Sequence, residues 1–234
     1  MAIINRIPRA FGGESLPYPF NIGWDLYCEA ELDDVNYDDD DNVDPIHDFS
    51  GNARNIAHNA GTAAKFKVNI KNGLGAFSFT NADTKYLTDT GKTINQPNHI
   101  FVVVNADSDP TGQALFDGID GTHKHRTYNY LANTYMVSAG TDTFGVGIND
   151  GWHILEYLFD GAGSTVTVDG VEVHSANYGA LPLTLMCLAC MFDQVAYGYQ
   201  NYICLWAVHD GELAGGDLTT YRSYLSTRYD IAVA

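Results

Sequence analysis

The sequence predicts an all-β protein, an antiparallel sandwich or barrel followed by one short C-terminal helix. Short runs of alternating apolar and polar residues recur along the chain, and Gly, Asn and Asp turns separate them. Only near the end, in GGDLTTYRSYLSTRYDI (215–231), does the spacing become helical. With 234 residues and 45% hydrophobic content, the chain is long enough for one such domain.

The first predicted strand is WDLYCEAEL (24–32), in which five apolar residues alternate with Asp25, Tyr27, Glu29 and Glu31. This alternation predicts one buried and one solvated face. Asp169-Gly170 predicts a tight hairpin turn, because both residues tolerate a positive φ. The other predicted strands are 75–80, 99–106, 112–119, 126–132, 134–140, 151–161, 164–175, 183–192 and 202–210.

Both ends of the chain depart from this β pattern. In the predicted C-terminal helix, Asp217 can cap the first turn, while Leu218, Tyr221, Leu225 and Tyr229 fall close to one face. Residues 1–22 contain three prolines and little periodicity, which predicts an extended N-terminal arm. We therefore expect an arm over 1–22 and one domain over 23–234.

The charge and hydropathy of the chain exclude two classes of partner. The 29 acidic and 12 basic residues give a formal net charge of −17, which repels nucleic acid. No run of about 18 apolar residues predicts a membrane helix, and the first residues lack the apolar stretch of a secretion signal. We expect no nucleic-acid binding and no membrane insertion.

The four cysteines are too few and too scattered for a disulfide scaffold. Cys187 and Cys190 form a CxxC pair, which also suits a metal or redox site. They lie in the apolar run LTLMCLACMF, and residues three apart on a strand face opposite sides. This pattern favours buried free thiols.

The stretch HDFSGNARN (47–55) predicts a tight turn. The carboxylate of Asp48 can accept hydrogen bonds from the following backbone N–H groups, while Gly51 and Asn52 tolerate left-handed backbone. We predict a structural role for this turn.

The order of several motifs resembles the concanavalin A-like, LamG-type domains: a D-x-S-G-N turn at 48–52, a GAFSFT strand, a W-H…F-D-G…V-D-G hairpin over 152–170 and a closing strand that leads into a helix. The resemblance covers roughly residues 24–231. It implies a two-sheet antiparallel jelly-roll sandwich with a short C-terminal helix. That fold serves lectins, glycan hydrolases, lyases and structural proteins, so it does not decide function.

A domain of this kind with a short arm is also similar to lectin-like proteins of tailed-phage virions. The resemblance implies a non-enzymatic virion protein, a capsid decoration or a tail-associated component, made in the host cytoplasm. Its arm would bind other virion proteins, and copies on a symmetric particle would form a homo-oligomer. Binding of cell-surface glycan would accompany this role. The alternatives are a free lectin and a glycan-cleaving enzyme.

Catalysis would need a pair of carboxylates. Glu29, Glu31 and Asp33 alternate along the first predicted strand, and related glucanases use alternating carboxylates. The order differs from the glucanase pattern, so a solvated strand face is favoured. The glycan-cleaving alternative would use Glu29, Glu31 or Glu156, as a hydrolase or a lyase.

The resemblance also implies calcium as a cofactor. The loop NYDDDDNVDP (36–45) offers Asp39, Asp41 and Asp44 as ligands, although it lacks the EF-hand pattern, and an exposed hairpin tip is favoured. In HKHRTYNY, His123 and His125 would share a strand face, which suits a metal less well than contact with an acidic surface.

Glycan binding needs flat aromatic rings together with amide and carboxylate groups. These residue types gather in two segments, and packing inside the sandwich explains the rings equally well. The candidate carbohydrate-binding residues are Tyr128, Tyr130, Asp193, Tyr197, Tyr199, Gln200, Asn201 and Tyr202.

Overall fold

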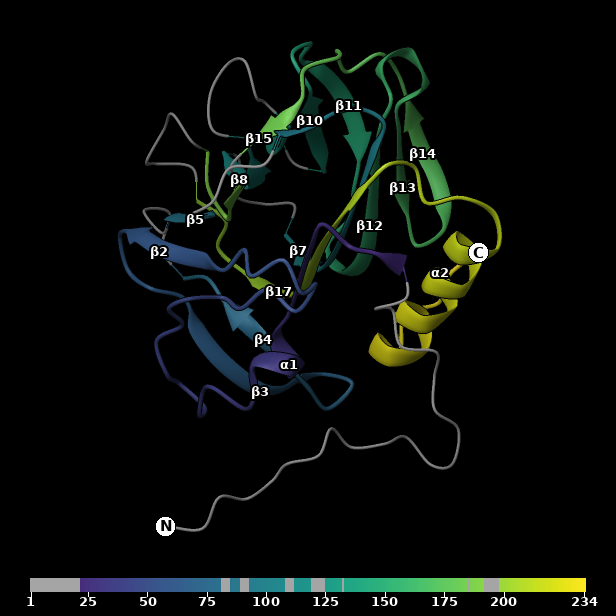
Figure 1. Cartoon of the computed structure of the whole chain (residues 1–234). Coiled ribbons are helices and arrows are strands. Elements are labelled where there is room, and N and C mark those ends of the chain that lie inside the picture. The colour runs from purple at the N-terminus through teal and green to yellow at the C-terminus, as the bar shows by residue number, and fades with distance from the viewer. Residues whose placement is uncertain are drawn as a thin grey trace.

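The computed structural model describes residues 22–80, 85–88, 93–107, 112–118, 125–131, 133–184, 186–191 and 198–234. The predicted arm over 1–22 thus lies almost wholly outside the described residues. Two antiparallel sheets dominate the fold (Figure 1). Sheet A contains β1 (Leu26–Glu29), β3 (Lys65–Lys71), β4 (Leu74–Ser78), β7 (Asn98–Ala106), β12 (Gly151–Phe159), β13 (Thr165–Val168), β14 (Val171–Ser175) and β17 (Tyr202–Asp210). Sheet B contains β2 (Ile56–Ala60), β5 (Lys85–Thr88), β8 (Gln113–Asp117), β9 (Arg126–Leu131), β10 (Thr134–Ser138), β11 (Thr143–Gly147) and β16 (Cys187–Leu188).

The strand order places β7 and β17 in the middle of sheet A, which runs β14-β13-β12-β7-β17-β4-β3, with β1 also paired to β17. Sheet B runs β11-β10-β9-β8-β16-β5-β2. A small separate pair joins β6 (Thr93–Ile94) to β15 (Leu183–Thr184). The helical elements of the described residues are α1 (Ala30–Asp33), the 3-10 turn η2 (Gly161–Gly163) and α2 (Gly215–Tyr229). The predicted two-sheet sandwich with a C-terminal helix is confirmed.

The main core lies between the two sheets. Val104 and Trp206 of sheet A share one buried cluster with Phe116 and Val137 of sheet B. The rings of Phe116 and Trp206 stack across the two layers, with centroids 6.2 Å apart. Each fully buried side chain of this size contributes about 1.5–3 kcal/mol, so this cluster is the main source of stability.

Helix α2 covers the outer face of sheet A (Figure 1). Tyr221, Leu225 and Tyr229 are buried in a second cluster with residues of β7 and β17, which confirms the predicted apolar face. The predicted cap is wrong: the N-cap is Ala214, so Asp217 lies within the first turn, where its charge still suits the helix dipole. The helix ends at Tyr229, and the C-cap residue Asp230 has a left-handed backbone with a φ of +49°.

The first predicted strand is shorter and more deeply buried than expected. β1 ends at Glu29, because Ala30–Asp33 forms the helical turn α1. Every residue of β1 is buried: Leu26 and Cys28 face the inter-sheet core, while Tyr27 and Glu29 lie beneath α2. The prediction of a solvated face was wrong because the alternation of polar residues cannot show that a later helix covers them.

The hairpin between β13 and β14 has the predicted turn, with φ of +51° at Asp169 and +82° at Gly170. The Asp169 carboxylate accepts hydrogen bonds from Ile154 N at 2.8 Å and His153 Nδ1 at 2.7 Å. Its backbone carbonyl accepts one from Ala234 N at 3.0 Å. The turn therefore also fixes the last residue of the chain.

Candidate functional site

The acidic side chains that catalysis would use are engaged in contacts that hold α2 and α1. Glu29, 1% exposed, binds Arg228 and accepts hydrogen bonds from the hydroxyls of Tyr27 and Tyr229, both at 2.9 Å. Glu156, also 1% exposed, accepts two hydrogen bonds from Nε and Nη2 of Arg222 at 2.8 and 2.7 Å. Both carboxylates thus anchor α2 to sheet A.

Glu31 and Asp33 lie on α1 rather than on a strand. Glu31 accepts a hydrogen bond from Gly75 N at 2.9 Å, and burial raises the pKa of its carboxyl. Asp33 is fully buried and binds Nδ1 of His47 at 2.6 Å, with a pKa also raised by burial. The expectation that Glu29, Glu31 and Asp33 share one strand face was wrong, because the strand ends before the last two.

The turn at 47–55 is a structural hub, as predicted. Asp48 Oδ1 accepts hydrogen bonds from the backbone N–H groups of Tyr27 at 3.0 Å and Ser50 at 2.9 Å, and Oδ2 accepts from Arg54 N at 2.9 Å. Gly51 has the expected positive φ of +91°, whereas the second such residue is Ala53 rather than Asn52. The turn therefore fastens onto β1.

The aspartate loop at 36–45 is exposed at Asp39, Asp41 and Asp44. Each of these carboxylates accepts a hydrogen bond from backbone N–H: Asp39 from Val68, Asp41 from Asp38 and Asp44 from His58. Among the described residues, no group of three acidic, His or Cys side chains is arranged to hold a metal ion. The loop is thus tied to the domain by its own carboxylates.

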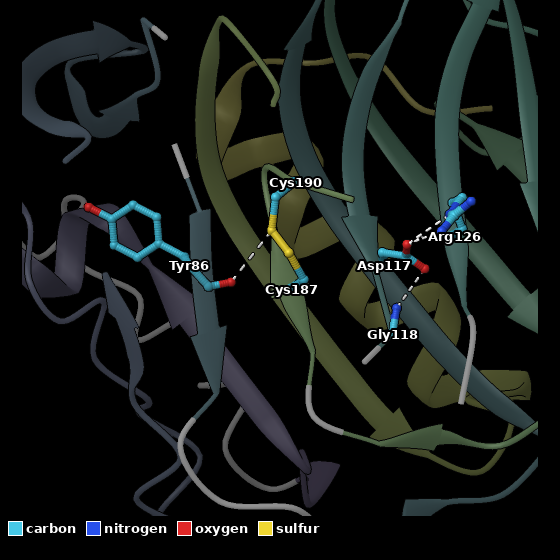
Figure 2. The surroundings of a disulfide bond; sticks show 6 residues. All are labelled: Tyr86, Asp117, Gly118, Arg126, Cys187 and Cys190. Carbon is cyan, nitrogen blue, oxygen red and sulfur yellow. Dashed lines mark hydrogen bonds and ion pairs between the residues drawn. A yellow bond between two sulfur atoms is a disulfide. The ribbon is translucent and has the colours of Figure 1, made fainter. Parts of the chain in front are cut away.

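Cys187 and Cys190 form a disulfide on the outer face of sheet B (Figure 2). Both are buried as predicted, but the prediction of free thiols was wrong. The run 183–192 is not one strand: β16 stops at Leu188, and Ala189 has a φ of +57°, so the chain turns and returns Cys190 to Cys187. Cys28 and Cys204 are buried free thiols.

Beside the disulfide, Figure 2 shows a buried ion pair on the neighbouring strands β8 and β9. Arg126 donates from Nε and Nη2 to Asp117 Oδ2 at 2.8 and 2.6 Å. His125 is fully buried, stacks on Phe159 and hydrogen bonds through Nε2 to Leu181 O at 2.8 Å. His123 lies outside the described residues, and neither His125 nor Arg126 contributes to an exposed basic surface as expected.

One end of the sandwich gathers amide and aromatic side chains from several strands. There β7, β9 and β11 end, and β8, β10, β12 and β17 begin. Gln113 Oε1 accepts a hydrogen bond from Gln200 N at 3.0 Å, and Asn129 Nδ2 donates to Asp107 O at 3.0 Å. These contacts join the two sheets, so segments far apart in sequence meet at this end.

The most distinctive feature of this end is a row of three residues across the outer face of sheet A. Trp152 on β12 pairs in register with Asn105 on β7, and Tyr202 begins the strand on the other side of β7. All three are half-buried. The rings of Trp152 and Tyr202 lie 6.3 Å apart at 22°, close to parallel. We call Trp152, Asn105 and Tyr202 the aromatic row.

Amide groups accompany the aromatic row. Gln200, exposed, and Asn201, half-buried, directly precede Tyr202. Asn201 Oδ1 accepts a hydrogen bond from Tyr202 N at 3.0 Å, which fixes the start of β17. The row thus combines flat rings with amide donors and acceptors, the groups that recognise sugar faces and sugar hydroxyls.

The other predicted carbohydrate-binding residues are distributed differently. Tyr199 is 3% exposed and its hydroxyl donates to Asn105 O, so it is a core residue. Tyr128 is half-buried and Tyr130 is 48% exposed on the outer face of sheet B, with ring centroids 6.5 Å apart. Asp193 and Tyr197 lie outside the described residues.

No protein-family model and no curated protein matches the chain. Solved structures do: domain 4 of AbnA, a GH43 extracellular arabinanase from Geobacillus stearothermophilus, in complex with arabinotriose, matches with a TM-score of 0.60 at 15% identity, over 84% of this chain and 96% of that one. The receptor binding domain of botulinum neurotoxin D matches with 0.59 at 10% identity, over 89% and 54%. The Trypanosoma rangeli sialidase in complex with the inhibitor DANA matches with 0.57 at 11% identity, over 90% and 34%.

These solved structures share the fold of this chain, a two-sheet antiparallel β sandwich. This confirms the fold class that the sequence predicted. The chain spans about half the length of the neurotoxin domain and a third of the sialidase, so it matches only part of each. Among the described residues of this sandwich, no helix combines the length and apolar character of a membrane span.

Sequence reasoning missed Trp152 and Asn105 as members of the site. Trp152 was assigned to a strand, and only its register beside Asn105 shows that it lies on the outer face next to Tyr202. The sequence does contain one signal. Trp152 directly follows the turn residues Asn149, Asp150 and Gly151, and a Trp at the start of a strand is well placed for partial exposure.

Proposed function

We propose that this protein is a non-catalytic carbohydrate-binding protein that holds a glycan on the aromatic row. The observation that carries the proposal is the near-parallel, half-buried pair of Trp152 and Tyr202, with Asn105 on the strand between them. Aromatic rings bury large apolar area at small entropic cost, and amides supply both donors and acceptors. One sugar ring packed on Trp152 or Tyr202 would place its hydroxyls within reach of Asn105.

The electrostatic surroundings favour a neutral sugar. Asp107 lies two residues beyond Asn105, and Asp150 lies two residues before Trp152. Burial raises the pKa of the Tyr135 phenol, and the charges of Asp107 and Asp150 raise it further. In a chain with a net charge of −17, carboxylates at the site can accept hydrogen bonds from hydroxyls but repel sialic or uronic acids.

The proposed absence of catalysis is supported by the roles of the acidic side chains. Glu29 and Glu156 are each 1% exposed and paired with an arginine of α2, and Glu31 accepts a hydrogen bond from Gly75 N. The glycan-cleaving alternative predicts that Glu29→Gln with Glu31→Gln abolishes turnover on a bound glycan. The binding proposal predicts that the wild-type protein does not cleave the bound glycan at all.

A glycan array tests the proposal. The wild type should bind a set of neutral glycans, and Trp152→Ala should weaken binding by about 2 kcal/mol, roughly thirtyfold. Tyr202→Ala should have a similar effect, and Asn105→Ala a smaller one of about 1 kcal/mol. Val35→Ala is the matched control, because Val35 is an exposed apolar residue (69%) far from this row in sequence. If Trp152→Ala and Tyr202→Ala keep full glycan binding and circular dichroism shows an intact fold, the proposal that the glycan lies on the aromatic row is contradicted.

The biological setting that we propose is a phage virion, where the protein acts as a capsid decoration or tail-associated component. Support comes from the sequence resemblance and from the proline-rich segment 1–22 as a docking element for other virion proteins. Deleting residues 1–20 should leave the domain folded, since β1 begins at Leu26, and should abolish incorporation into particles. Unchanged incorporation would contradict the docking role, and a protein that ignores particles altogether would be a free lectin.

A further inference from the structure

A second surface of the molecule has a different chemistry from the aromatic row. Three exposed apolar side chains lie on β9 and β11 of sheet B: Tyr130 at 48%, Leu131 at 54% and Phe144 at 49%. Two more, Val171 at 52% and Val173 at 39%, lie on β14. Strands β11 and β14 are the edges of the two sheets and lie against each other (Figure 1). One side of the sandwich therefore carries five of the six large apolar side chains exposed among the described residues.

The rings on sheet B form a continuous surface. Met136 on β10 pairs in register with Tyr128 on one side and Phe144 on the other. Val137 points into the core, so its neighbour Met136 faces outward, and Tyr128 and Phe144, which pair with Met136, share that face. A register shift between Tyr135 and Met136 lets Val146 face the core although it lies only two residues from Phe144. Met136 is 5% exposed, so the rings beside it form the accessible part of this face. Tyr130 reaches across to Phe144, with ring centroids 4.9 Å apart. We call Tyr128, Tyr130, Met136 and Phe144 the outer strip.

The outer strip is free of charge in a highly acidic protein. Strands β9, β10 and β11 contain one charged residue, Arg126, which is 9% exposed and bound to Asp117, whereas the whole chain has 41 charged residues. The outward positions on these strands also offer few hydrogen-bonding groups: Asn129, the amide on β9, faces inward and is 1% exposed. A sugar would find rings here but few partners for its hydroxyls.

We propose that the outer strip is the interface at which a second copy of this chain binds, by a two-fold contact that buries Tyr130 and Phe144 of both copies. Two copies with a net charge of −17 each repel one another at charged surfaces. They can approach where both present an uncharged apolar face, and in a two-fold dimer the same strip faces itself. A basic partner would instead need carboxylates, which the strip lacks. Tyr and Phe, the accessible side chains of the strip, are also enriched at interface centres.

Light scattering during size-exclusion chromatography, over a range of protein concentrations, tests the interface. The wild type should be a dimer, and added salt should strengthen it by screening the like charges. Phe144→Glu with Tyr130→Glu should raise the dimer dissociation constant at least tenfold, because each copy gains two charges at the contact. Val35→Glu changes an equally apolar exposed residue outside the strip and should leave the dimer intact.

A distance measurement with a spin label distinguishes loss of the dimer from misfolding of the variant. Thr143→Cys on the edge strand β11 provides a labelling site next to Phe144. Gly145, on the other side of Phe144, is unsuitable because its φ of +103° would strain a residue with a side chain. A spin label at Thr143 should report a second label at short range in the dimer and none after Phe144→Glu. A monomer at all concentrations and salt levels, a dimer that persists in the Glu variants, or loss of glycan binding instead of dimerisation would each overturn the proposal.

Discussion

Tyr27 and Asp48, 21 residues apart, are joined by a hydrogen bond of 3.0 Å from the Tyr27 backbone N–H to Asp48 Oδ1. The same carboxylate also accepts from Ser50 N, Ser50 Oγ and Arg54 N, so one side chain holds both its own turn and β1. Asp48→Ala leaves these donors unpaired and should lower the free energy of unfolding by about 3 kcal/mol.

Urea unfolding measures this loss. Asp48→Asn keeps the Oδ1 acceptor and should lose less than Asp48→Ala. Glu212→Ala changes an exposed carboxylate and should stay within about 0.5 kcal/mol of the wild type. An Asp48→Ala variant as stable as the control would show that the turn does not fasten β1.

Arg228 and Glu29 should act as a unit that anchors α2. Arg228→Met leaves the Glu29 carboxylate buried without its cation and should cost about 3–5 kcal/mol. Arg228→Met combined with Glu29→Gln should cost less than the sum of the two single changes, because the unpaired charge is then absent. Additive losses in urea unfolding would contradict a direct coupling between the two side chains.

His125 should make the protein sensitive to acid. Burial lowers the pKa of this imidazole from 6.5 to about 4. The unfolded state then binds a proton at a higher pH than the folded state, so the stability from neutral His125 is present above pH 6.5 and is lost as pH falls towards about 4. The slope from this residue is at most about 1.4 kcal/mol per pH unit.

The contribution of His125 can be isolated with His125→Gln, which keeps a donor for Leu181 O. The difference in urea midpoint between the wild type and His125→Gln should shrink as pH falls through this window. A difference that stays constant would show that His125 titrates normally in the folded protein. His99, whose pKa burial also lowers to about 3, is unchanged in both proteins and cancels in the comparison.

The disulfide between Cys187 and Cys190 should contribute modestly to stability. It closes a loop with a sequence separation of only 3, for which the chain-entropy model gives about 2 kcal/mol. Cys187→Ser with Cys190→Ser should lose this amount. A thiol assay on the unfolded, unreduced protein should detect two free cysteines, Cys28 and Cys204; four free thiols would contradict the pairing.

The sequence predicts the sandwich well where alternation reflects burial on one face. The strands over 99–106 and 202–210 and the turn at Asp169-Gly170 are placed to within a residue or two. Helix α2 is also located correctly, because Tyr221, Leu225 and Tyr229 repeat at the helical spacing. Local periodicity contains this information, since each element shows its buried face in its own residues.

Two errors arise where distant parts of the chain decide the outcome. The polar residues of β1 predicted a solvent-exposed face. In the structure, Arg228, 199 residues away in sequence, pairs with the Glu29 carboxylate beneath α2. The run 183–192 suggested one continuous strand, but the chain turns at Ala189 and pairs Cys187 with Cys190. The aromatic row was missed in part for the same reason, because strand register and not sequence distance brings Trp152 to Tyr202.

The measurement that tests the central claim most directly is acrylamide quenching of tryptophan fluorescence with and without a neutral glycan that binds on the array. Of the three tryptophans, Trp24 and Trp206 are 3% and 1% exposed, so Trp152 should account for the quenching. We predict that bound glycan shields this fluorescence and that Trp152→Phe removes both the quenching and the shielding. Glycan binding that leaves the quenching of Trp152 unchanged would contradict the proposal that the sugar lies on the aromatic row.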